Sequence, residues 1–343
     1  MSTRPVHLRP NLVEHFYAGG ARIAALRGIE TTSPRQPEEW LAATVSRVDD
    51  PDQGLARTVE GDVLRDLVAA DPRAWTGGLG AWDGDTGLLL KLLDAGQRLP
   101  VHVHPDRAFA ASHLECPYGK TESWLVLGAE RDAAVYLGWS TDVDPVDVAK
   151  ARDAQDSEWM LGRMHRVPVR RGDGILVPAG TAHAIGEGVF VAEAQEPTDF
   201  SILLEWSVTT SGRDDSHLGL GFDVAMQALD HAETPARRLE ELIAHHDLDA
   251  PTAPATSLLP AEADPFFRID LVADGGQVGD GFAALVVLAG EGRLRGGSGT
   301  VDVRAGDALA VPAAFGTWRV EGDVRLLAAR PGTETPRREG PRG

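Results

Sequence analysis

Short apolar runs separated by glycine and proline recur along this chain of 343 residues. Such runs are bounded by turn-forming residues and favour β-strands over long helices. Lys91 interrupts one of them, and a charged side chain in a buried strand needs a partner or a function. The pattern predicts a mainly β fold, with strands at residues 37–46, 88–93, 122–127, 133–139, 166–169, 175–177, 188–193, 201–206, 267–272 and 283–290.

Helical spacing of apolar residues appears in only a few segments. It occurs near residues 63–68, in a charged insert at about 142–165, and at 222–247, where Pro235 should divide two helices. Pro, Ala, Ser and Thr dominate 250–260, which predicts a linker. The charged, Pro/Gly-rich residues 331–343 predict a disordered tail.

Two histidines stand two residues apart in the sequence His102-Val103-His104-Pro105. On a β-strand, residues i and i+2 point to the same face, so both imidazoles should enter one space. Pro105 should then end the strand pairing. Two imidazoles on a rigid strand supply half of a typical metal site.

Two later segments complete a pattern similar to the two cupin motifs. Gly96 stands five intervening residues before His102, and Glu122 begins a later apolar run. The second motif, Gly, five residues, Pro-x-Gly, two residues and His, is matched by Gly172, Pro178, Gly180 and His183. The resemblance implies that one metal ion is bound by His102, His104, Glu122 and His183.

Residues 306–312 repeat the Gly-to-Pro interval of residues 172–178. Thr317 stands where the first repeat has its histidine, so the second unit should lack a metal site. The predicted fold is a double cupin, two β-barrel or jelly-roll units with small helical insertions. We expect a metal-binding cupin at 1–215, a helical segment and linker at 216–255, a degenerate cupin at 256–330 and the tail at 331–343.

Several ordered segments resemble class I mannose-6-phosphate isomerases, which are zinc-dependent cupins. They are Glu38-Glu39-Trp40, residues 89–95 (Leu-Leu-Lys-Leu-Leu-Asp-Ala), residues 102–106, Gly119-Lys120-Thr121-Glu122-Ser123-Trp124, and residues 178–184. The resemblance covers about residues 15–206 well and the second cupin loosely. It implies aldose–ketose isomerisation of mannose 6-phosphate and fructose 6-phosphate.

Three positions depart from the family pattern. His102 stands where the family has a glutamine ligand. The resulting set of three histidines and one carboxylate can bind Zn²⁺, but also Mn²⁺, Fe²⁺, Co²⁺ or Ni²⁺. Pro100 stands where the family often has a phosphate-contacting serine, and residues 201–206 contain no arginine where the family has one. These departures favour two alternatives: an isomerase or epimerase of an unphosphorylated sugar, and a non-catalytic sugar-binding or regulatory cupin. A dioxygenase would also suit the ligands, but the Gly-Lys-Thr-Glu segment argues against it.

Candidate catalytic and substrate-binding residues follow from the resemblance and from strand geometry. Lys120 lies two residues before Glu122, on the same face, and is our first candidate for the acid/base or oxyanion-stabilising group. Lys91 and Asp94 are the next catalytic candidates. The expected substrate-binding residues are Trp40, Glu39 and Glu193.

Composition narrows the class of partner. The net charge of -19 disfavours nucleic acid. A single cysteine, Cys116, excludes an internal disulfide, and the first residues lack the apolar core of a signal peptide. No apolar run is long enough to span a membrane. We therefore expect a cytoplasmic monomer or homodimer that binds a small sugar or sugar phosphate, without nucleic-acid or membrane partners.

Overall fold

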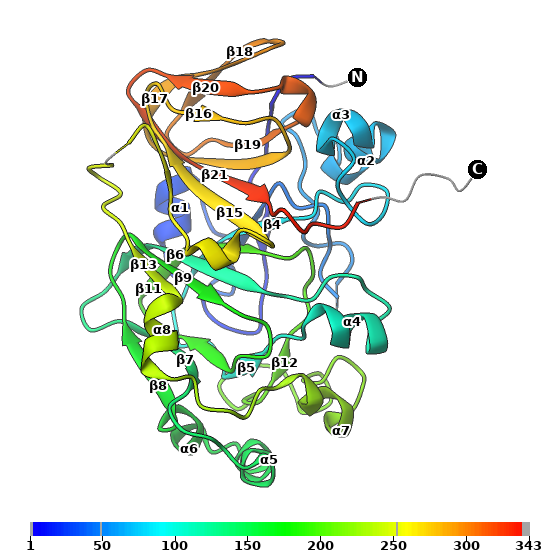
Figure 1. Cartoon of the computed structure of the whole chain (residues 1–343), viewed down its shortest axis with the longest axis vertical. Helices are drawn as coiled ribbons and strands as arrows, with labels where there is room; N and C mark the ends of the chain where they lie inside the picture. Colours follow the sequence, from blue (N-terminus) through cyan, green and yellow to red (C-terminus); the bar gives the residue numbers. More distant parts are fainter. Residues whose placement is uncertain (1–2, 49, 252, 338–343) are drawn as a thin grey trace.

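The computed structural model describes residues 3–48, 50–251 and 253–337, and the chain builds three β-sheets (Figure 1). Every ladder within them is antiparallel. The mainly β architecture predicted from the sequence is confirmed. No helix in the described ranges is long and apolar enough to cross a membrane.

The central sheet has seven strands. Their order is β13 (Ile243–His245), β9 (Asp173–Val177), β6 (Glu122–Ala129), β11 (Val189–Gln195), β4 (Leu89–Asp94), β3 (Glu38–Leu41) and β2 (Leu12–Val13). β4 and β11 are buried along their whole length, as expected for apolar strands covered on both faces.

A smaller sheet of five strands completes the first unit. Its order is β12 (Ile202–Leu203), β5 (His102–Val103), β10 (His183–Ile185), β7 (Ala134–Trp139) and β8 (Met164–Pro168). Residues of both sheets line one cavity, which therefore lies between them.

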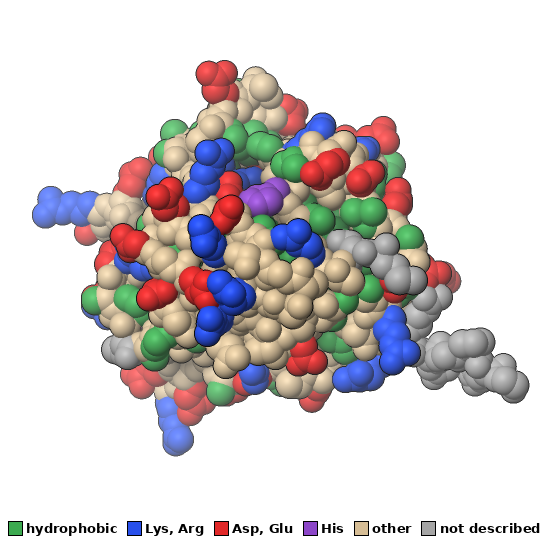
Figure 2. Space-filling view, turned by 90° about the horizontal axis from the view of Figure 1, so that it is seen from above, with side chains coloured by type: hydrophobic (Ala, Val, Ile, Leu, Met, Phe, Trp, Pro, Cys, Tyr) green, Lys and Arg blue, Asp and Glu red, His purple; other side chains and the backbone are tan. Residues whose placement is uncertain are grey.

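The second unit is a nine-stranded sheet at the other end of the molecule (Figure 1). Its strands are β1 (Val6–His7), β14 (Ala255–Ser257), β15 (Phe267–Val272), β16 (Gln277–Val278), β17 (Ala283–Gly296), β18 (Gly299–Arg304), β19 (Ala308–Val311), β20 (Trp318–Glu321) and β21 (Val324–Pro331). It has its own apolar interior around Leu285, Phe315 and Trp318. Seen from this end, basic and acidic side chains are interspersed over the surface (Figure 2).

Helices are short and lie outside the sheets. They are α1 (Arg22–Arg27), α2 (Leu64–Ala70), α3 (Pro72–Thr76), α4 (Arg107–His113), α5 (Pro145–Ala154), α6 (Ser157–Leu161), α7 (Phe222–Ala225) and α8 (Ala236–Glu241), with 3₁₀ turns η1 (Met226–Ala228), η2 (Ala261–Ala263) and η3 (Ala313–Phe315). The predicted insert at about 142–165 contains α5 and α6. Asp144 accepts a hydrogen bond from Val146 N–H at the start of α5.

The two units share one apolar core. Leu90, Leu92 and Val126 of the central sheet belong to the same cluster as Ile269, Leu271 and Leu327 of the second unit. Burying apolar surface contributes about 25 cal/mol per Å², so this shared layer should hold the units together.

Three details of the predicted organisation are wrong. Val6 pairs with Ala310, so the N-terminal strand belongs to the second unit's sheet rather than to the unit at 1–215. The segment expected to be helical at 222–247 ends in β13, which pairs with β9 because it closes the open edge of the central sheet. The expected linker at 250–260 contains β14, which pairs with β15.

The expected disordered tail is wrong for residues 331–337, whereas 338–343 lie outside the described residues. Gly332 N–H donates to Phe266 O at 2.9 Å, and Gly80 N–H donates to Pro336 O at 2.8 Å. Thr335 is buried against Gly87. Backbone pairing and this contact hold the segment in place although its composition is polar.

Candidate active site and metal centre

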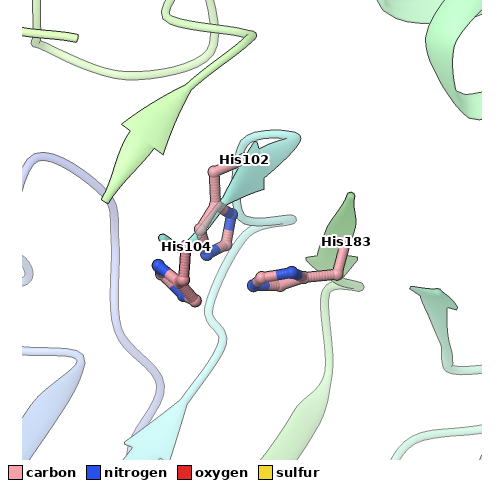
Figure 3. Close-up of side chains that lie close together, drawn as sticks. All are labelled: His102, His104 and His183. Carbon is pink, nitrogen blue, oxygen red and sulfur yellow. The ribbon is translucent and has the colours of Figure 1, made fainter. Parts of the chain in front are cut away.

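Three imidazoles converge between the two sheets of the first unit (Figure 3). His102 lies on β5, His104 follows it, and His183 begins β10, where it is the direct cross-strand partner of His102. One ring nitrogen from each histidine lies within 4.8 Å of the others, and all three side chains are buried. The structure thus brings together three of the four predicted ligands in a group that could hold one metal ion.

The outward-facing nitrogen of each ring is tied to a backbone carbonyl. Nδ1 lies 2.9 Å from Pro100 O in His102, 2.7 Å from Phe200 O in His104, and 2.8 Å from Thr181 O in His183. Nδ1 must donate in each pair, because a carbonyl only accepts. Nε2 is then the unprotonated nitrogen, the state and support found in protein metal ligands.

The environment keeps the His102 and His104 rings neutral. Burial and the neighbouring imidazoles lower the pKa of His102 well below its usual value, and burial together with Lys120 lowers the pKa of His104 to about 3. His183 Nε2 is buried without a hydrogen-bond partner. An unpartnered, unprotonated nitrogen aimed at two other imidazoles is what a divalent metal ion would satisfy.

Glu122, at the start of β6, lies at the edge of this group. Its Oε2 is 2.9 Å from His104 Nε2 and its Oε1 is 3.4 Å from His183 Nε2. Trp124 Nε1–H donates to Oε1 at 3.0 Å and orients the carboxylate. Burial would raise the pKa of Glu122, but the charge of Lys120 opposes this, and the pKa is held well below its ordinary value.

Lys120 lies beside the same two groups. Its Nζ is 2.5 Å from Glu122 Oε2 and 2.7 Å from His104 Nε2. Lys120 and Glu122 share a face because they are two residues apart on extended backbone. The structure therefore places the ammonium group predicted from the sequence directly beside the candidate metal ligands.

A second buried charge cluster forms the floor of the cavity. Lys91 Nζ lies 3.3 Å from Glu38 Oε2 and 3.4 Å from Glu193 Oε1, because β4 lies between β3 and β11. Burial would lower the pKa of Lys91, but Glu38 and Glu193 outweigh it and raise the pKa. Burial and the nearby Glu122 raise the pKa of Glu193 to about 7. Glu193 Oε1 has no hydrogen-bond partner and borders the cavity.

The cavity has an inner chamber and an outer vestibule, the vestibule being the wider space lined by Glu14, Asp50 and Asp214 among others. The inner chamber contains about 440 Å³ of space between atoms, including its open mouth, and is lined by Lys91, Lys120, Glu122 and Glu193. Five residues line both spaces and define what we call the neck: His15, Phe16, Asp199, Ser201 and Leu203. A small molecule could reach the metal group through this neck.

Three of the six predicted catalytic and substrate-binding residues do not line the cavity. Glu39 points to the opposite face of β3, where its carboxylate accepts hydrogen bonds of 2.9 and 3.0 Å from Arg27 Nε. Asp94 faces the same way and accepts 2.7 Å hydrogen bonds from Arg22 N and Nε. Trp40 is completely buried beneath Lys91, whose Nζ lies 4.9 Å from the ring centroid. Strand register therefore places the side chains expected to bind substrate, Glu39 and Trp40, and the expected catalytic Asp94 away from the cavity.

Sequence reasoning missed Glu38, His15 and Asp199. Glu38 shares a face with Trp40, which pairs with Lys91, so the register between β3 and β4 would have indicated it. Trp40 Nε1–H donates to Glu38 Oε2 at 2.7 Å, and Tyr17 OH also donates to Glu38. His15 and Asp199 lie in irregular segments and carry no periodic signal.

Besides His102, the other two departures from the family pattern also border the chamber. Pro100 lines it and offers no hydroxyl or N–H, although its carbonyl orients His102. Leu203, on β12, faces the chamber from the segment that lacks arginine.

The chain is similar to known proteins over most of its length. It is 30% identical over 253 residues to a mannose-6-phosphate isomerase of Streptococcus mutans, covering 71% of this chain and 73% of that protein. It is 26% identical to mannose-6-phosphate isomerase ManA of Bacillus subtilis, covering 96% and 99%. No protein-family model matches.

Solved structures agree in fold. The mannose 6-phosphate isomerase of Bacillus subtilis superposes with a TM-score of 0.72 at 23% identity, covering 95% of this chain and 99% of the other. A putative mannosephosphate isomerase of Archaeoglobus fulgidus superposes with a TM-score of 0.71 at 17% identity, covering 97% and 99%.

Fold and site together define a cupin-type protein whose first unit could hold a metal ion. Within that class, the extent of the match to the Streptococcus mutans enzyme shows that this chain belongs to the mannose-6-phosphate isomerase family. The resemblance seen in the sequence is confirmed.

Proposed function

We propose that this protein is a metal-dependent aldose–ketose isomerase that interconverts mannose 6-phosphate and fructose 6-phosphate. The names of its relatives support this reaction and this substrate. The observation that carries the proposal is the position of the Lys120 ammonium between His104 and Glu122, on the wall of the cavity.

His102, His104 and His183 would hold the metal ion, with Glu122 as the fourth ligand. Zn²⁺ suits three imidazoles and a carboxylate, and Mn²⁺, Fe²⁺, Co²⁺ and Ni²⁺ are alternatives for the same set. When bound, the ion would polarise the substrate carbonyl.

Isomerisation moves a proton between C1 and C2 of the sugar through an enediolate. Lys120 is the group we assign to this step, because it is buried beside the chamber. Its ammonium form can donate a proton to a sugar oxygen, and its neutral amine form can accept one from carbon. Glu193 lines the chamber, and its Oε1 forms an ion pair with Lys91 but no hydrogen bond, so it would accept a hydrogen bond from a sugar hydroxyl. Lys91, paired with two carboxylates, would keep Glu38 and Glu193 in position.

Solvent exchange tests the proposal directly. Metal-reconstituted protein should incorporate deuterium from D₂O into mannose 6-phosphate and produce fructose 6-phosphate. Lys120→Met should lower kcat by about 10²–10⁴-fold, the usual effect of losing a general acid/base, with metal content unchanged. Lys150→Met, at an exposed position on α5, is the matched control. Absence of exchange with every sugar tested would leave the non-catalytic sugar-binding alternative.

Three finer expectations accompany this function: a small sugar or sugar phosphate as the only class of partner, a cytoplasmic location, and a monomer or homodimer. Our proposed domain organisation remains a metal-binding unit at 1–215, a connecting segment at 216–255, a second unit at 256–330 and a tail at 331–343. It is amended by the pairings of β1 with β19, β13 with β9 and β14 with β15.

A further inference from the structure

Glu196 follows the last residue of β11 and is not among the residues that line the cavity. Its side chain is only 2% exposed, so its carboxylate is removed from water. A buried carboxylate needs partners that compensate for its lost hydration. Two partners do so here, and each belongs to a segment that carries residues of the site.

The first partner is the backbone between Lys120 and Glu122. Thr121 N–H donates to Glu196 Oε2 at 3.0 Å, and Glu196 N–H donates to Thr121 O at 3.1 Å. Thr121 is therefore held at its amide and at its carbonyl by one residue. The side chains of Lys120 and Glu122 extend from this backbone, so Glu196 helps to fix where they stand.

The second partner is Arg107, the first residue of α4. Its Nε donates to Glu196 Oε1 at 2.6 Å, so each carboxylate oxygen is held by a different segment. The start of α4 also packs against the residues before Thr121. Lys120 N–H donates to Pro105 O at 2.9 Å. A Cβ added to Gly119 would lie 2.6 Å from Pro105 O and 2.7 Å from Arg107 N, so only glycine fits at this crossing.

Arg107 also reaches the segment after β21. Its Nη1 donates to Glu334 O at 3.1 Å, and its guanidinium carbon lies 5.0 Å from the centre of the Phe266 ring. Glu334 N–H in turn donates to Pro265 O at 2.9 Å. A continuous series of contacts thus runs from the second unit through Arg107 and Glu196 to the backbone between Lys120 and Glu122.

Many ion pairs between strands serve stability alone, as the pair of Arg330 with Asp270 in the second unit should. Glu196 differs because the N–H group that it accepts lies between the proposed acid/base and the proposed fourth metal ligand. Misplacing a reacting group by about 1 Å can cost about 10²-fold in rate. Loss of this support would therefore reach the chemistry even if the fold survives.

We propose that Glu196 and Arg107 are positioning residues of the isomerase site, and that the segment after β21 acts on the site through Arg107. Neither residue lines the cavity, so both act through Lys120 and Glu122. This role rests on the proposed isomerase function and deepens it, because it gives the second unit a part in the site.

Variants of Glu196 test the positioning role. Glu196→Ala removes the acceptor of Thr121 N–H, and it should lower kcat for mannose 6-phosphate and weaken Co²⁺ binding by about 10–100-fold each, with a smaller change in KM. The visible absorption of bound Co²⁺, which depends on ligand geometry, should change with it. Glu196→Gln keeps an oxygen acceptor and should recover part of each effect. Asp270→Asn, which breaks the ion pair in the second unit, is the control and should alter none of these measurements.

Wild-type kcat, Co²⁺ affinity and Co²⁺ absorption in folded Glu196→Ala protein would overturn the proposal and leave Glu196 a purely structural residue. If that variant does not fold, Arg107→Ala should show the same losses, and Arg107→Lys should restore part of them. Wild-type values in both Arg107 variants would likewise overturn it. Absence of isomerisation by the wild-type protein would contradict the proposed function, whereas the Co²⁺ measurements would still decide the positioning role.

Chains ending at Pro331 and at Arg337 test the link to the second unit. Below the melting temperatures of both, the chain ending at Pro331 should have a kcat about 3–10-fold lower, the effect of one lost hydrogen bond to Arg107. In the Arg107→Ala background the two chains should have equal kcat, because the contact that distinguishes them is already gone. No loss with Arg107 present, or a loss of equal size in both backgrounds, would overturn the link.

Discussion

His183 lies directly opposite His102 in the antiparallel pairing of β10 with β5, and their ring centroids are 4.1 Å apart. This one cross-strand pair joins the two sequence motifs into a single site. Each ring is oriented by a carbonyl two residues before it, Pro100 O and Thr181 O. The same local arrangement therefore supports both imidazoles.

Metal binding should depend on this pair and on His104. His104→Ala and His183→Ala should each weaken metal binding sharply, because both remove a buried ligand whose other nitrogen is already fixed. Metal analysis of the purified proteins measures this, with His113→Ala as the control. Wild-type metal content in both ligand variants would show that the ion is bound elsewhere.

Glu39 should matter for stability and not for the site. Glu39→Ala leaves the guanidinium of Arg27 without its buried partner, and breaking such a pair costs about 3–5 kcal/mol. Denaturant unfolding should show this loss. KM measured on the folded fraction should stay at the wild-type value. A large rise in KM without loss of stability would instead make Glu39 a substrate ligand.

The ionisation of Glu205, which accepts hydrogen bonds beside β5, should make the free energy of unfolding depend on pH. Burial would raise its pKa, but hydrogen bonds from Arg98, Ser157 and Val101 N outweigh burial and lower it. Arg98 Nη1 and Nη2 both donate at 2.7 Å. A lowered folded pKa contributes stability above the unfolded value of about 4.3, and that stability is lost as pH falls through the folded pKa.

Glu205→Gln should therefore destabilise the protein by about 1.5–3 kcal/mol at neutral pH, the contribution of hydrogen bonds to a charged group. The difference from wild type should shrink at acidic pH. Unfolding free energies measured across the acid range test the sign. A difference that grows on acidification would refute the assignment.

The segment after β21 should contribute to stability. Ending the chain at Pro331 removes the backbone hydrogen bonds made by Gly332, Thr333 and Glu334 with Phe266, Asp264 and Pro265, and the one that Gly80 makes with Pro336. At about 0.5–1.5 kcal/mol for each of these four hydrogen bonds, their loss should lower the unfolding free energy by about 2–6 kcal/mol. A chain ending at Arg337 keeps these contacts and is the matched comparison. Equal melting temperatures for the two chains would contradict the prediction.

The sequence by itself determined which neighbouring side chains share a face of a strand and which motifs recur along the chain. The alternation of a strand places His102 and His104 together, and likewise Lys120 and Glu122, because residues two apart share a face whatever the surroundings. The interval from Gly172 to Pro178 and its repeat at 306–312 indicated the two units, since each copy is one short strand between a glycine and a proline. These inferences required no knowledge of which strands pair.

Tertiary structure decided which face of each strand meets the cavity. Glu38 and Glu39 are neighbours of the same type, yet the register of β3 on β4 directs Glu38 to Lys91 and Glu39 to Arg27. A shift of one residue would exchange them, and no local pattern distinguishes the two because both are fully buried charges. His15 and Asp199 reach the neck from irregular segments, whose positions follow from packing rather than from any periodicity.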